Sequence, residues 1–143
     1  MAAVLIVDDE QVVRQVLLRW LKATGHEIYE AESADAALQF LERQPVSVVF
    51  SDIQMPGHDG IWLTTEIRKR YPATAVVLAT AVSTIPPRFS MQAGVLAYIV
   101  KPFDHKAVLD ALATALDWNS HAGKGPAQPI QIDTLQSWLE SLL

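Results

Sequence analysis

The stretch VSVVFSDIQMPGHDG, residues 46–60, decides how the chain folds. Its first five residues are β-branched or aromatic apart from Ser47, which is typical of a buried strand. The strand pattern stops at Asp52, and a turn with proline and glycine leads to a helical pattern that opens at Asp59 or Gly60. A buried strand that ends in a carboxylate places that charge at an edge of its sheet, so Asp52 is the first candidate site residue.

The same change from strand to helix pattern recurs along most of the chain. Short apolar runs favour strands, and a period of about 3.6 residues between them favours helices. Four of the runs are almost free of polar residues, as in parallel strands covered on both faces, whereas Glu27–Ala31 alternates and suits an edge strand. Repeated strand–helix units predict an α/β fold with a doubly wound parallel sheet and helices on both faces. The predicted strands are Ala3–Val7, Glu27–Ala31, Val46–Ser51, Ala75–Ala79 and Ala97–Val100.

Helix boundaries can be predicted between these strands. Side chains that can accept a hydrogen bond from a helix N-terminus precede three of the four long helical patterns, and a glycine follows the first. The segment between the fourth and fifth strands is weaker, because Pro86–Pro87 leaves only about two turns, over Pro87–Ala93. The boundary residues are Gly25 at the end of the first helix, and Ser33, Asp59 (or Gly60) and Asp104 at the starts of the others.

The composition changes after residue 118. NSHAGKGPAQP, residues 119–129, is polar and contains glycine and proline, which predicts a linker after a domain of residues 1–118. Residues 130–143 then predict a short amphipathic helix, which is marginal alone in water and needs a partner surface. That surface is its own domain, a second copy of the chain or the junction to an effector, and we favour a weak homodimer. The apolar side chains of this helix are Ile132, Leu135, Trp138, Leu139 and Leu142.

Overall composition excludes several classes of protein. A net charge of −5 offers no basic face for direct nucleic acid binding, and the absence of cysteine excludes disulfides and thiolate metal sites. The N-terminus lacks the basic region of a signal peptide, and no apolar run reaches the ~20 residues of a membrane helix. We therefore expect a cytoplasmic protein without membrane insertion, either a stand-alone domain or the leading part of a longer protein.

Polar side chains follow four of the predicted strands. The acidic turn Asp8–Glu10 follows the first strand, Asp52 the third, Thr80 the fourth and Lys101 the fifth. Each alone has an ordinary structural explanation, such as an acidic helix N-terminus. The carboxyl ends of parallel strands meet at one edge of a sheet, however, so these groups converge. Clustered carboxylates predict a hard cation, Mg²⁺ or Mn²⁺, beside which an aspartate can accept a phosphoryl group while lysine and threonine bind its oxygens.

Four motifs in this order resemble the receiver domain of two-component response regulators, of the chemotaxis-receiver type. They are LIVDDE, FSDIQMPGHDG, VVLATA and AYIVKPF, at residues 5–10, 50–60, 76–81 and 97–103. The resemblance covers about residues 3–118 and implies a flavodoxin-like sheet of five strands in the order 2-1-3-4-5. It also implies a regulatory protein, one that catalyses only its own phosphotransfer and autodephosphorylation. The donor would be a sensor histidine kinase or a phosphotransfer protein, and the output partner is unknown.

The resemblance also implies a role for each site residue. Asp52 is the expected phosphoacceptor, and Lys101, joined to Pro102 by an expected cis bond, is the expected phosphoryl-binding ammonium. The expected metal ligands are Asp9 directly, Asp8 largely through water, Asp52, and Gln54 through its backbone carbonyl. The expected switch residues are Thr80 and Tyr98.

Three other functions are compatible with parts of this pattern. A haloacid dehalogenase-type phosphohydrolase would resemble a D-x-D pattern and carry a cap domain, but Gln54 stands two residues after Asp52 and the chain has no room for a cap. A flavodoxin-like flavin mononucleotide binder would place the flavin phosphate against the acidic turn Asp8–Glu10, which would repel it. A receiver fold that works without phosphorylation would be indicated by a missing site residue, and all are present.

Overall fold

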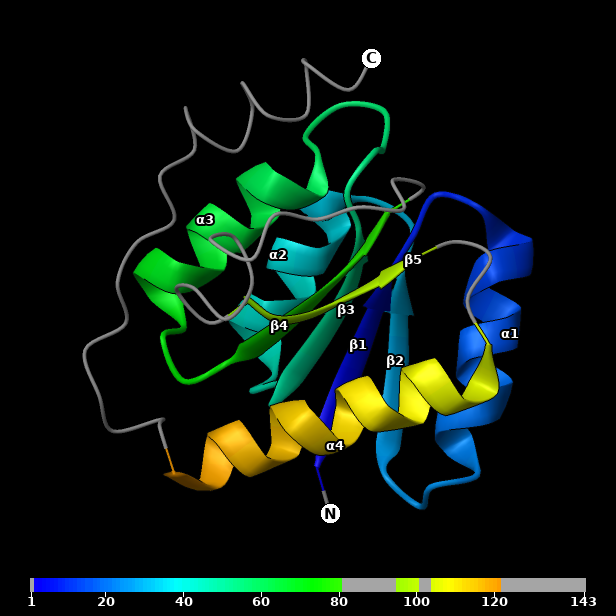
Figure 1. Cartoon of the computed structure of the whole chain (residues 1–143). Helices are drawn as coiled ribbons and strands as arrows, with labels where there is room; N and C mark the ends of the chain where they lie inside the picture. The colour runs from blue at the N-terminus through cyan, green and yellow to red at the C-terminus, as the bar shows by residue number, and fades with distance from the viewer. Residues whose placement is uncertain (1, 81–94, 101–103, 122–143) are drawn as a thin grey trace.

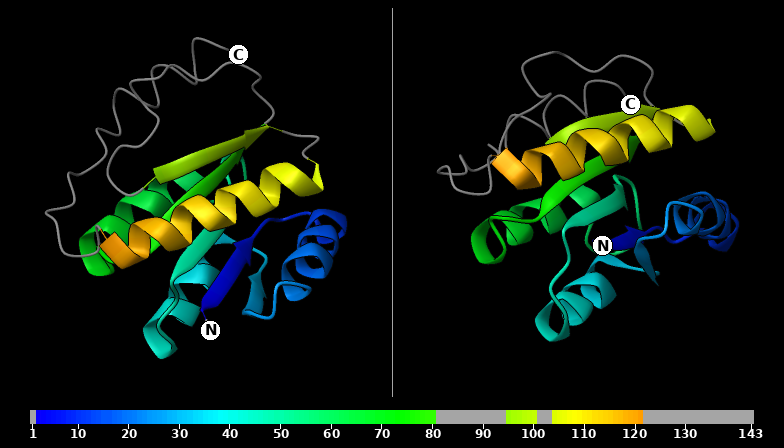
Figure 2. Two further views of the ribbon diagram at one scale, coloured as in Figure 1. Left: turned by 60° about the horizontal axis from the view of Figure 1, so that its bottom comes forward. Right: turned by 90° about the horizontal axis from the view of Figure 1, so that it is seen from below.

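The chain forms a parallel five-stranded sheet with helices on both faces, in the strand order β2-β1-β3-β4-β5 (Figures 1 and 2). This is the order that the sequence resemblance implied. The computed structural model describes residues 2–80, 95–100 and 104–121; for Thr80, residues 95–100 and His121 it describes the backbone only. The weak helix expected at Pro87–Ala93, the Lys101–Pro102 bond and the helix expected at residues 130–143 lie outside the described residues.

The described elements alternate along the chain as predicted. Each predicted cap is confirmed: the side-chain oxygens of Ser33, Asp59 and Asp104 accept hydrogen bonds from the backbone nitrogens of Ala36, Trp62 and Ala107. In order, the elements are β1 (Ala3–Val7), α1 (Gln11–Lys22), β2 (Glu27–Ala31), α2 (Ala34–Arg43), β3 (Val48–Asp52), α3 (Gly60–Arg70), β4 (Ala75–Thr80), β5 (Val95–Val100) and α4 (His105–His121).

Each face of the sheet has its own apolar core. Along β1 the side chains alternate between the two faces, so Leu5 packs with α2 and α3 while Val4 and Ile6 pack with α1 and α4. Both clusters consist of side chains that are almost completely buried, which explains why the strand sequences are apolar throughout. Because helices cover both faces of the sheet, the loops at the strand ends remain its accessible parts.

Several predicted boundaries were wrong. β3 ends at Asp52 rather than Ser51, β4 ends at Thr80 rather than Ala79, and β5 begins at Val95 rather than Ala97. β3 begins at Val48 rather than Val46, since the Val46 carbonyl accepts a hydrogen bond from the Thr74 hydroxyl instead of joining the strand ladder. α4 continues to His121, so the linker cannot begin at Asn119. Polar residues continue this helix because the Asn119 amide donates to backbone carbonyls of Ser47 and Ala73.

Candidate functional site

Four acidic side chains meet at the carboxyl edge of the sheet. One carboxylate oxygen from each of Asp8, Asp9, Glu10 and Asp52 lies within 4.8 Å of the others. The strand pairing explains this convergence, because β1 and β3 are hydrogen-bonded neighbours that point in the same direction (Figure 1). The predicted meeting of the acidic turn Asp8–Glu10 with Asp52 at one edge is therefore confirmed.

The cluster combines two buried and two exposed carboxylates. Asp8 and Asp52 are 1 % and 7 % exposed, whereas Asp9 and Glu10 are open to solvent. Backbone amides hold both buried groups: Asp8 Oδ1 accepts from the Glu10 nitrogen at 2.9 Å, and Asp52 Oδ1 accepts from the Gln54 nitrogen at 3.3 Å. The two buried carboxylates thus have defined orientations, while the two exposed ones leave a route to solvent.

A closed loop carries the chain from Asp52 into α3. Gly60 N donates to the Ile53 carbonyl at 2.9 Å, and Ile53 N donates to the Ala79 carbonyl on β4 at 3.0 Å. The sequence predicted a turn with proline and glycine here, and two glycines of the loop have separate structural reasons. Gly57 has a φ of +79°, which suits glycine. Gly60 serves a different need, because a Cβ there would lie 2.1 Å from the Asp52 carbonyl oxygen.

His58 ties this loop to α2. Its ring stacks on Trp62 with centroids 3.6 Å apart, and its Nδ1 lies 2.9 Å from Asp35 Oδ1. Both partners of the His58–Asp35 contact are more than half exposed, so its energetic contribution is small. Together the stacked pair and the ion pair join the loop to α3 and to α2.

Three predicted site residues are described only in part or not at all. Thr80 is the last residue of β4 and directly follows Ala79, which pairs with Asp52. Tyr98 lies on β5 and pairs with Leu78. Backbone positions therefore place Thr80 at the same edge as Asp52, whereas the side chains of Thr80 and Tyr98 and the whole of Lys101 lie outside what the structure describes.

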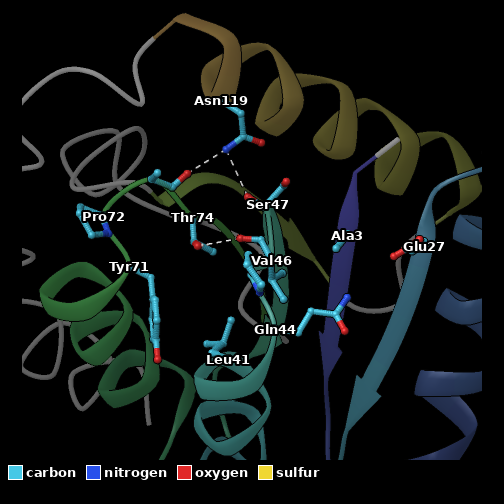
Figure 3. A pocket seen from close by; sticks show the side chains of 12 residues that line it. Ala3, Glu27, Leu41, Gln44, Val46, Ser47, Tyr71, Pro72, Thr74 and Asn119 are labelled. Atoms are coloured by element: carbon cyan, nitrogen blue, oxygen red, sulfur yellow. Dashed lines mark hydrogen bonds between the residues drawn. The ribbon is translucent and has the colours of Figure 1, made fainter.

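A cavity of about 680 Å³ lies at the opposite, amino edge of the sheet (Figure 3). Its walls include Leu41, Tyr71 and Pro72, together with Asn119, whose amide donates to the carbonyls of Ser47 and Ala73. No titratable cluster of the kind found around Asp52 occurs there among the described residues. The candidate chemistry therefore belongs to the carboxyl edge.

Among the described residues, none of the helices is long and apolar enough to cross a membrane.

Comparison with known proteins identifies the family. The model of the response regulator receiver domain matches residues 4–113, which is most of the chain. The chain belongs to the response regulator receiver family. The response regulator protein FleR of Pseudomonas aeruginosa is 42 % identical over 113 residues, which are 78 % of this chain and 24 % of FleR. The receiver spans about a quarter of the length of the curated relatives it matches.

Solved structures agree with this assignment. A CheY-like receiver domain protein from Methanospirillum hungatei has a TM-score of 0.76 and 26 % identity, with 84 % of this chain and 97 % of that one covered. The chemotaxis protein CheY4 of Vibrio cholerae has a TM-score of 0.72 and 28 % identity, with 79 % and 97 % covered. Members of this family are regulatory proteins that accept a phosphoryl group and switch an output partner, and this receiver shares that function.

Proposed function

We propose that Asp52 is the phosphoacceptor of this receiver and that the reaction depends on a divalent cation. The observation that carries the proposal is the cluster of four carboxylates within 4.8 Å at the end of β1 and β3. Acidic groups so close together repel one another unless a cation lies among them. The cluster offers only oxygen ligands, which suits Mg²⁺ or Mn²⁺ and not a soft metal.

The residues that would hold Mg²⁺ are Asp8, Asp9 and Asp52, with the backbone carbonyl of Gln54. When bound, the ion neutralises charge that develops on the phosphoryl oxygens during transfer. Asp9 is exposed and suits direct ligation, whereas Asp8 is buried and already accepts a hydrogen bond, which suits contact through water. The family resemblance implied the same division of roles.

Asp52 supplies the nucleophilic oxygen. One carboxylate oxygen forms the new P–O bond while the P–N bond of a phosphohistidine donor breaks and its electron pair stays on the imidazole nitrogen. The Gln54 amide holds Oδ1 and thereby limits rotation of the carboxylate. Burial of Asp52 to 7 % exposure limits the access of water to the phosphorylated side chain.

Three further roles belong to the same proposal. Thr80 would donate a hydrogen bond to the phosphoryl group and Lys101 would neutralise part of its charge. The position of Thr80 one residue after the Asp52 partner Ala79 supports its role. Tyr98, on the neighbouring strand β5, would change its position when Thr80 engages the phosphoryl group.

The partners that we propose follow from this chemistry. The phosphoryl donor is a sensor histidine kinase or a phosphotransfer protein in the cytoplasm, and the acceptor of the signal is an output partner or domain. We also propose weak homodimerisation through residues 130–143, because their apolar side chains recur at three- and four-residue spacings.

Intact mass measurement after incubation with acetyl phosphate and Mg²⁺ tests the proposal. We expect a phosphoryl adduct on the wild-type receiver, and none after Asp52→Asn or after removal of divalent metal with EDTA. An adduct that persists in Asp52→Asn would assign the acceptor to another residue, and one that forms in EDTA would remove the metal from the mechanism.

A further inference from the structure

Arg14, on the first turn of α1, reaches beneath the acidic turn. Its Nη1 donates to the backbone carbonyl of Asp8 at 2.7 Å, and its Nε donates to Glu30 Oε1 on β2 at 3.0 Å. The Arg14 side chain is only 11 % exposed. A guanidinium that is mostly shielded from solvent and held at two points has little freedom to turn away from the Asp8 carbonyl.

The Asp8 carbonyl belongs to the peptide bond that joins Asp8 to Asp9. That unit is planar, so a bond to its oxygen fixes the orientation of the plane and the direction in which the chain leaves toward the Asp9 Cα. The nitrogen of Asp8 is held in turn by the Ala31 carbonyl at 3.2 Å. Arg14 therefore completes the backbone support of the two adjacent carboxylates.

Charge alone would give Arg14 the opposite effect. A cation beside an acidic cluster lowers its attraction for a second cation, so removing Arg14 would strengthen Mg²⁺ binding if electrostatics dominated. Removing Arg14 would also leave Glu30 unpaired, which adds negative charge beside the cluster. Weaker Mg²⁺ binding after its removal would therefore report a geometric contribution that exceeds the electrostatic one.

We propose that Arg14 is a positioning residue for the metal site: its bond to the Asp8 carbonyl holds Asp8 and Asp9 in the arrangement that binds the divalent cation. This inference rests on the proposed function, because it presumes that the cluster binds Mg²⁺. Groups that orient metal ligands typically alter affinity by about 10- to 100-fold when they are removed.

Isothermal titration with Mg²⁺ alone, on the full chain, tests this role. We expect Arg14→Gln and Arg14→Lys each to bind Mg²⁺ about tenfold more weakly than the wild type. Lysine keeps the charge but lacks the rigid fork that bonds to Asp8 and Glu30 together. Arg19→Gln is the matched control, since Arg19 lies exposed on the same helix and its removal changes the net charge by the same amount.

Thermal unfolding of each variant in EDTA separates positioning from stability. Mg²⁺ affinities within twofold of the wild type would overturn the inference, even if the variants melt at a lower temperature, and so would tighter binding by Arg14→Gln. Weaker binding by Arg14→Lys, with Arg19→Gln unchanged, supports it. If the wild-type receiver itself binds no Mg²⁺, the proposed function fails, and the inference fails with it.

Discussion

Gly60 shows how one residue without a side chain shapes the site. It is the first residue of α3, and its φ is not in the left-handed region, so backbone conformation does not demand glycine there. Glycine is required there because any Cβ would overlap the Asp52 carbonyl oxygen. The start of α3 is thereby pressed against the backbone of the proposed phosphoacceptor.

Gly60→Ala should therefore damage both stability and phosphorylation. The overlap involves two backbone segments that cannot rotate away, so we expect a loss of about 3 kcal/mol in the free energy of unfolding. We also expect slower formation of the phosphoryl adduct, because relief of the overlap moves Asp52. Urea denaturation and intact mass after acetyl phosphate treatment measure the two effects.

Gly25→Ala provides the control for this prediction. Gly25 has a φ of +87° with open space around it, so alanine there costs about 1–2 kcal/mol of strain at a position outside the acidic cluster. Gly25→Ala should lose stability and keep its phosphorylation rate. Normal phosphorylation of Gly60→Ala would contradict the link between Gly60 and Asp52.

At the scale of elements, the buried side chain of Arg68 binds the backbone that follows α3. Arg68 is 6 % exposed, and its guanidinium donates to the carbonyls of Tyr71, Pro72 and Thr74 in the connection to β4. Burial lowers the pKa of Arg68 to about 10, so the group remains charged at neutral pH. Its Cζ also lies 5.7 Å from the ring centroid of Trp118, which links α3 to α4.

Arg68→Ala should destabilise the receiver by about 2–3 kcal/mol, because backbone carbonyls lose a charged donor. Arg70→Ala is the matched control: Arg70 lies two residues away, half exposed, in surface ion pairs with Glu66 and Glu42, and we expect a change within about 1 kcal/mol. Chemical denaturation measures both, and equal effects would show that the carbonyl contacts of Arg68 contribute little.

The elements also separate what local sequence predicts from what it does not. The caps at Ser33, Asp59 and Asp104 were predictable because each side chain bonds to a backbone nitrogen three residues away. The end of α4 was not, because Asn119 bonds to Ser47 and Ala73, which are 72 and 46 positions distant. Partners at such separations become apparent only when the chain is folded.

The contacts at the site likewise divide into those that the local sequence predicts and those that it does not. The apolar pattern predicts where each strand ends, and parallel strands place their carboxyl ends at one edge of the sheet. The convergence of Asp8, Asp9 and Asp52 was therefore predictable. The contact of Arg14 with the Asp8 carbonyl and the close approach of Gly60 to Asp52 were not, since both involve backbone atoms rather than a recognisable pair of side chains. The sequence offers only an arginine and a glycine near the motifs as a signal.

At the scale of the whole molecule, the two edges of the sheet have different characters. The carboxyl edge contains the acidic cluster, and the amino edge contains the cavity between the ends of α2, α3 and α4. Asn119, two residues before the end of α4 at His121, lies at that amino edge (Figure 3). The described end of α4 therefore lies on the side of the sheet away from Asp52.

Deletion of residues 124–143 should alter association more than phosphorylation. If the apolar side chains of residues 130–143 join two copies, sedimentation should show a lower mass for the deleted chain. The phosphoryl adduct should form as before, since the deletion removes no residue of the acidic cluster. An unchanged oligomeric state with a lower melting temperature would instead show that the segment packs on its own domain, contrary to the proposed homodimer.

α4 has a further mechanical consequence. Its 17 residues extend about 25 Å at 1.5 Å per residue, from just after the segment of Lys101 to the amino edge. Asn119 fastens the far end to the backbone before β3 and before β4. Val108, Ala111, Leu112 and Ala115 are buried along the same helix, so α4 is held against the sheet along its length as well as at its end. The helix therefore joins the carboxyl edge of the sheet to its amino edge through a single rigid element.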